Sequence, residues 1–110
     1  MQHQVLENGR WAEMSFPPQM ANIGSEASRS YRALEAGKEA RAESAFARFQ
    51  DLVDLTIKYG RANAAPLLRS ALLEELCRFR ELYCQAFLDR NLLELAAFNR
   101  YLDCFALILN

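Results

Sequence analysis

The chain has 110 residues, of which 52% are hydrophobic, enough for one domain with a single core. Thirteen Lys and Arg against fourteen Asp and Glu leave a net charge of -1, which excludes a bulk electrostatic attraction to nucleic acid or an anionic membrane. The three cysteines, Cys77, Cys84 and Cys104, all fall within helical pattern and are expected to be reduced thiols rather than a disulfide framework.

The first ten residues, 1–10, are mostly polar and lack the apolar stretch of a secretion signal. The longest apolar run, 104–109, is far shorter than a membrane span. We therefore expect a cytoplasmic protein without a membrane partner, in which an extended leader (1–14) packs on a single helical domain (15–110).

A first helix is predicted over 17–36. Ser15 before Pro17 is a helix-start signal, and Gly37 supplies the left-handed residue that helix ends favour. Gly24 lies beside the apolar stripe and would let a neighbouring helix approach closely. The stripe itself follows helical spacing: Met20, Ile23, Ala27, Tyr31 and Leu34.

Three further helices are predicted, over 39–59, 66–88 and 92–109. Gly60 ends the second helix, and Pro66 suits the first turn of the third. Asn91 followed by Glu94 has the spacing of a capping box at the start of the fourth. Because the connections are short, the sequence predicts an all-α protein, an antiparallel four-helix bundle.

The third helix has more apolar surface than one face can hold. Its core stripe has the members Leu68, Leu72, Leu76, Phe79, Tyr83 and Ala86. A second stripe lies roughly 100 to 160° around the axis from Leu72. With two residues of the last helix, it predicts an oligomer interface, a dimer being favoured, formed by Leu73, Cys77, Cys84, Leu88, Cys104 and Leu107.

Arg80 falls between the two stripes of the third helix, so its guanidinium is expected to be partly buried and to require a carboxylate. Glu26 is the predicted partner, with Asp54 and Asp103 as the next candidates. Such a bridge between the first and third helices would fix their register more than it would add stability.

The sequence lacks several of the residue combinations on which common catalytic mechanisms depend. The single histidine, His3, lies in the leader, so no cysteine or serine of the helical domain has a histidine base. Cys-x-x-Cys and Glu-x-x-His pairs are absent and the glycines are scattered, so we expect no metal and no cofactor and favour a non-catalytic protein. Acid-base catalysis by carboxylates alone stays open. The polar residues that could bind an anion or organise a proton transfer are Asn22, Glu26, Arg29, Arg78, Arg80 and Glu81.

Several runs of the sequence resemble a family of small, uncharacterised helical proteins of bacteria and archaea. The runs are RWAEMS (10–15), QMANIGSE (19–26), AFAR (45–48), DLTI (54–57) and RFREL (78–82). This resemblance covers most of the chain and implies a helical fold without an assigned activity. A weaker likeness is to HEPN-type helical bundles, which dimerise and place an Arg and a His at the dimer interface. Neither Arg78 nor Arg80 is followed by the histidine of that motif, so the likeness implies a bundle that binds RNA or nucleotide without cutting it.

Three functional hypotheses follow. The first is a non-catalytic bundle that acts through self-association and by binding a partner protein. The second is an RNA- or nucleotide-binding bundle that uses Arg29, Arg78 and Arg80 on phosphates, which the net acidity disfavours. The third is a carboxylate- and arginine-based enzyme on the polar face of the first helix.

Overall fold

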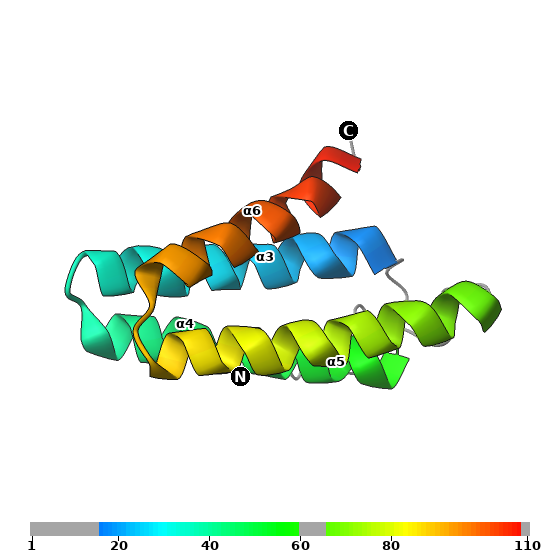
Figure 1. The fold of residues 1–110 in the computed structure, drawn as a ribbon, viewed down its shortest axis with the longest axis horizontal. Coiled ribbons are helices and arrows are strands. Elements are labelled where there is room, and N and C mark those ends of the chain that lie inside the picture. The colour runs from blue at the N-terminus through cyan, green and yellow to red at the C-terminus, as the bar shows by residue number, and fades with distance from the viewer. Residues whose placement is uncertain (1–15, 60–65, 109–110) are drawn as a thin grey trace.

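The computed structural model describes residues 16–59 and 66–108, and within those ranges it consists of four α-helices joined by turns, without a strand (Figure 1). The all-α class is therefore confirmed. The predicted leader, 1–14, lies outside the described residues. The helices are α3 (Phe16–Glu35), α4 (Glu39–Tyr59), α5 (Pro66–Leu88) and α6 (Leu92–Ile108), each within one residue of its predicted bounds.

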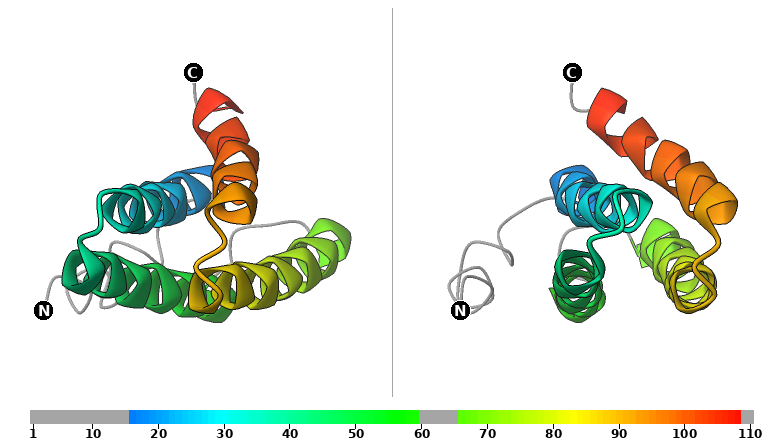
Figure 2. Two further views of the ribbon diagram at one scale, coloured as in Figure 1. Left: turned by 60° about the vertical axis from the view of Figure 1, so that its left-hand side comes forward. Right: turned by 90° about the vertical axis from the view of Figure 1, so that its left-hand side faces the viewer.

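The chain reverses direction at the turns after α3 and after α5 (Figure 1). Helix α3 packs against α4 and α6, and α5 packs against the same two helices from the other side. Viewed from the end, α3 and α5 lie diagonally opposite each other (Figure 2). This diagonal relation decides which polar groups on α3 and α5 can meet.

The core is one continuous cluster. It contains the described residues of the core stripe predicted on the third helix, together with Met20, Ile23 and Ala27 of the stripe predicted on the first. Tyr31, Leu34 and Phe46 are only partly buried and pack against its edge. Leu55, which was not assigned to a stripe, is buried as well. The large core residues with almost no exposed surface include Ile23, Phe49, Val53, Tyr83, Leu95 and Leu102.

Aromatic rings fill the space between α5 and its neighbours. Phe46 stacks on Phe87 with ring centroids 4.0 Å apart, and Phe49 meets Tyr83 at 4.5 Å. On the other side, the ring of Phe79 lies edge-on to that of Phe98 at 5.5 Å. Because rings rather than small side chains separate the backbones, α5 is held to α4 and α6 by a layer of aromatic contacts.

Helix α3, in contrast, approaches α6 closely at a glycine. A Cβ atom added at Gly24 would lie 3.3 Å from the Cβ of Leu102. The prediction that Gly24 permits a close neighbour is confirmed, and that neighbour is α6.

Two helices end with a residue in the left-handed region. At the end of α3, Gly37 has φ 74°, and the N–H of Lys38 donates to the carbonyl of Ala33 at 2.8 Å. At the end of α5, Arg90 has φ 54°, and the N–H of Asn91 donates to the carbonyl of Ala86 at 2.9 Å. Both turns are Schellman motifs, so the predicted closure at Gly37 is confirmed.

Arg90 lacks the conformational freedom of glycine, and its side chain supplies compensating contacts. Its Nη1 donates to the Phe87 carbonyl at 2.7 Å, and the guanidinium lies 4.7 Å from the Phe87 ring centroid. Its Nε donates to Glu39 at 2.8 Å, and Glu43 accepts a second, longer ion pair at 3.5 Å. Arg90 thus links the turn after α5 to the first turns of α4.

Asn91 caps α6 as predicted, with one difference. Its Oδ1 accepts from the Glu94 N–H at 3.2 Å, which is the first half of a capping box. In a complete capping box the Glu94 carboxylate would accept from the Asn91 backbone N–H. Here it accepts from the Asn91 side-chain amide instead, at 3.1 Å.

Replacing Gly24 with leucine should force α3 away from α6. We expect Gly24→Leu to lower the free energy of unfolding by about 1 to 3 kcal/mol, as overpacking does elsewhere. Chemical denaturation followed by circular dichroism measures the change. Asn22→Leu adds a similar side chain at an exposed position of the same helix and should leave stability nearly unchanged; equal effects of the two variants would contradict the close contact.

Candidate functional site

The second stripe of α5 stays outside the core formed by the described residues. Cys77 is exposed, Leu73 and Cys84 are half-buried, and 67% of Leu88 is exposed. The core stripe of the same helix is buried at Leu76, Phe79, Tyr83 and Ala86. The interface residues predicted on α6, Cys104 and Leu107, lie outside the described side chains.

The stripe forms one wall of a shallow hollow of about 520 Å³ beside α4. Arg80 lies in this hollow, and its Nη1 is 2.6 Å from the Asp54 carboxylate of α4. The amide of Gln50, also on α4, donates to the Cys84 sulfur at 3.6 Å. The lining is therefore mixed, with thiols and a leucine beside one ion pair; its residues include Gln50, Cys77, Arg80, Glu81, Cys84 and Leu88.

The Cys84 thiol has little nucleophilic character. Partial burial raises its pKa above the ordinary value, and the nearby Arg80 guanidinium lowers it only in part. A thiol in this environment stays protonated at neutral pH. The hollow is suited to apolar contact rather than to covalent catalysis.

The predicted ion pair between Arg80 and Glu26 is wrong. Glu26 is buried, and its carboxylate accepts from Arg29 Nη1 at 3.0 Å and from Arg48 Nε at 3.2 Å. Arg80 instead pairs with Asp54, which was the next candidate. The physical reason is that α3 and α5 are diagonally opposite (Figure 2), so the helix that reaches Glu26 is α4.

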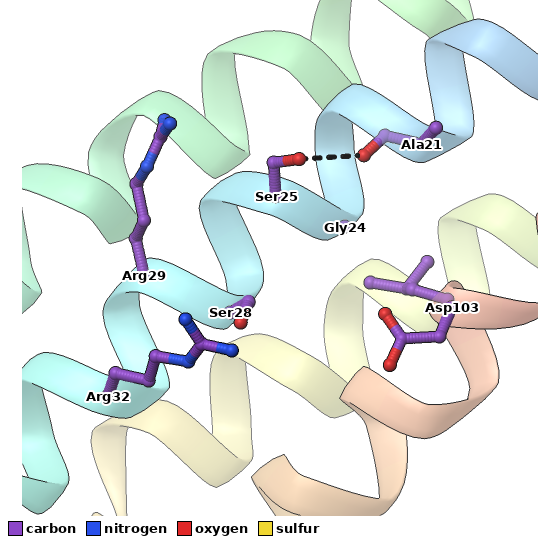
Figure 3. A pocket seen from close by; sticks show the side chains of 8 residues that line it. Ala21, Gly24, Ser25, Ser28, Arg29, Arg32 and Asp103 are labelled. Atoms are coloured by element: carbon purple, nitrogen blue, oxygen red, sulfur yellow. Dashed lines mark hydrogen bonds between the residues drawn. The ribbon is translucent and has the colours of Figure 1, made fainter. Parts of the chain in front are cut away.

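A second, smaller hollow of about 290 Å³ lies between α3 and α6 (Figure 3). Small residues of α3, among them Gly24 and Ser28, line it. In Figure 3, Arg32 and Asp103 extend toward this hollow from opposite sides. Arg29 also lines it. Its charged lining residues are Arg29 and Arg32 of α3 and Asp103 of α6, so cationic and anionic side chains border the same hollow.

The six polar candidates do not converge on one place. Asn22 uses its amide on the carbonyl of Pro18, within its own helix. Glu26 and Arg29 pair with each other on α3, while Arg80 and Glu81 line the hollow on α5. Arg78 is exposed on α5. Since the candidates lie on two diagonally opposite helices, they do not form a shared catalytic site.

Sequence reasoning missed a buried hydroxyl pair that joins α3 to α5. The Tyr83 Oη lies 2.9 Å from the Ser30 Oγ, and the two hydroxyls lie 2.9 and 2.8 Å from the Ala27 carbonyl oxygen. Burial raises the pKa of Tyr83 to about 12, although the hydrogen bond with Ser30 opposes the shift. The phenol is therefore a structural hydrogen-bond donor at neutral pH, not a base. The available signal in the sequence was that Tyr83, a residue of the core stripe, carries a hydroxyl that needs a hydrogen-bond partner when it is buried.

Other site classes have no support within the described ranges. Among the residues whose side chains the structure describes, no group of three or more His, Cys, Asp and Glu is placed to hold a metal ion. No helix of that part of the chain combines the length and apolarity that crossing a bilayer requires.

Comparison of the chain with known protein families, curated proteins and solved structures finds no match. The features that bear on function are the exposed α5 stripe and the pairing of the polar groups.

Removing the Tyr83 hydroxyl should lower stability and change its pH dependence. Tyr83→Phe is expected to cost about 0.5 to 1.5 kcal/mol at neutral pH because a buried hydrogen bond is lost. In the wild type, the unfolded state loses the phenolic proton above pH 10 while the folded state keeps it to about pH 12. The free energy of unfolding should thus fall between these values, with a slope of up to about 1.4 kcal/mol per pH unit from this group.

Denaturant titrations at a series of alkaline pH values measure this slope in both proteins. The Tyr83→Phe variant should show a shallower decline than the wild type. Identical slopes would contradict the assignment of the raised pKa to Tyr83.

Proposed function

We propose that this protein is a non-catalytic antiparallel four-helix bundle that acts through self-association and through binding a partner protein. A dimer is favoured, and a reducing cytoplasm would keep its cysteines as thiols. The observation that carries the proposal is the α5 stripe, which remains exposed although the same helix already contributes a full apolar face to the core.

Burial of this stripe would stabilise an association. Leu88 is 67% exposed on the stripe, and the half-buried Leu73 and Cys84 extend its apolar surface along the helix. Removing apolar surface from water contributes roughly 25 cal/mol per Å² before the costs of association are subtracted. Helix α6 would extend the interface through Cys104 and Leu107, in keeping with the apolar composition of its last turns.

The polar groups support a non-catalytic role. Glu26 is occupied by two arginines, Arg80 by Asp54, and the Tyr83 hydroxyl by Ser30 and Ala27. Each of these interactions satisfies a group that burial would otherwise destabilise. Such pairs position the helices and leave no activated acid, base or nucleophile in the α5 hollow.

The RNA-binding alternative has less support. Arg29 and Arg80 each pair with a carboxylate and lie on diagonally opposite helices, so they do not form a continuous basic surface. The resemblances to a family of small bacterial and archaeal proteins and to HEPN-type bundles remain proposals. A gel-shift assay with labelled RNA at low salt would favour this alternative if it gave a complex that weakens steeply as salt is added.

Self-association is tested by size-exclusion chromatography with light scattering at tens of micromolar. We expect a mass that is a multiple of the 12.6 kDa chain, two-fold for the favoured dimer. Leu88→Glu should shift the equilibrium to the monomer because it places a charge in a stripe that association would bury. A wild-type monomer at this concentration would contradict the proposal.

The chain offers a matched control on the same helix. Leu82 is 50% exposed but lies about 140° around the α5 axis from Cys77. Leu82→Glu makes the same chemical change away from the stripe and should leave the oligomer intact. Equal dissociation by both variants would show that the contact does not run along this stripe.

A further inference from the structure

The stripe on α5 is nearly a palindrome about one point of the helix. Leu73 and Leu88 are equally far from the midpoint between residues 80 and 81, and so are Cys77 and Cys84. At the midpoint, Arg80 and Glu81 are adjacent and oppositely charged. Within the stripe, residues at equal distances on the two sides are therefore either identical and apolar or of opposite charge.

These residues also share one face of the helix. At about 100° per residue, all of them lie within about 60° of Cys77 around the axis. Most of them line the hollow beside α4 and are exposed or half-buried. The pattern is thus available on the surface rather than hidden in the core.

We infer that the partner of this stripe is the same stripe of a second copy, with the two α5 helices antiparallel about a two-fold axis that passes between Arg80 and Glu81. The inference rests on the self-association proposed above and adds its geometry. The axis places Leu73 opposite the partner's Leu88, Cys77 opposite the partner's Cys84, and Arg80 opposite the partner's Glu81. An interface of this kind is isologous, since each contact occurs twice.

The charges select the antiparallel arrangement. In a parallel, in-register pair, Arg80 would face the partner's Arg80 and Glu81 the partner's Glu81, and both juxtapositions are repulsive. The antiparallel pair brings opposite charges together on both sides of the axis. Asp54 holds the Arg80 guanidinium beside the stripe at 2.6 Å, so Arg80 is already oriented before the second copy binds.

Charge reversal tests the register. Glu81→Arg puts arginines opposite each other, and Arg80→Glu puts carboxylates opposite each other, so each variant alone should be mainly monomeric by light scattering. Mixing the two variants restores opposite charges at both contacts, and a heterodimer should form. Glu75→Arg, about 160° around the axis from Cys77, is the matched control and should dimerise like the wild type.

Disulfide trapping tests the same register independently. In a Cys104→Ser background, Cys77→Ser leaves only Cys84 and Cys84→Ser leaves only Cys77. In the antiparallel pair, like thiols of the two copies are roughly 10 Å apart along the axes, too far for a disulfide, whereas Cys77 and the partner's Cys84 are opposite each other. Diamide, which takes up the two hydrogens released as the S–S bond forms, should therefore give a covalent dimer in the mixture of the two variants and little in either alone.

The outcomes separate this inference from the proposed function. A wild-type dimer whose single-cysteine variants cross-link alone, but not preferentially in the mixture, would overturn the antiparallel register and leave self-association standing. A wild-type monomer would overturn both. A monomer whose Cys77 and Cys84 also resist a maleimide would show that another part of the same chain covers the stripe.

Discussion

The aromatic layer between α5 and its neighbours is the interaction on which the architecture depends. Phe46 and Phe49 of α4 meet Tyr83 and Phe87 of α5 within ring-contact distance, and Phe79 continues the layer to α6. These rings use one face of α5 completely. The hydroxyl of Tyr83 then reaches across the core to Ala27, so the same ring that fills the core also ties α5 to the diagonally opposite helix. Because the core-facing side of α5 is filled by these contacts, the other apolar residues of α5, such as Leu82 and Leu88, lie outside the core.

Polar contacts divide into two kinds with different roles. Arg90 and Asn91 shape the turn after α5, and Arg90 also ties that turn to Glu39 at the start of α4. Glu26 and Arg48 connect α3 to α4 at a partly buried site. A partly buried ion pair such as that of Glu26 with Arg48 specifies which helices are neighbours more than it adds net stability, because desolvation offsets much of the attraction between the charges.

The proposed function rests on the apolar surface of α5 that the core does not bury. Helix α5 has an exposed stripe with identical apolar residues at equal distances from its centre and with two oppositely charged residues, Arg80 and Glu81, at the centre itself. A surface that matches itself after a two-fold rotation is the simplest route to a closed dimer. The stripe borders the shallow hollow beside α4, and within this hollow Arg80 forms an ion pair with Asp54.

Local sequence signals determined the helices, their ends and most of the core, because helix periodicity, Pro66, Gly37 and the Asn91 cap act within a few residues of their own position. The surplus of apolar surface on α5 was visible in the same periodicity. Only the tertiary structure decided the partners of the charged groups. Which carboxylate Arg80 meets, and that Arg48 reaches Glu26, depends on which helices are adjacent and which are diagonal, and periodicity along one helix carries no information about that. The left-handed conformation of Arg90 was hidden for a related reason: the ring of Phe87 and the carboxylates of Glu39 and Glu43 that compensate for it come together only in the fold.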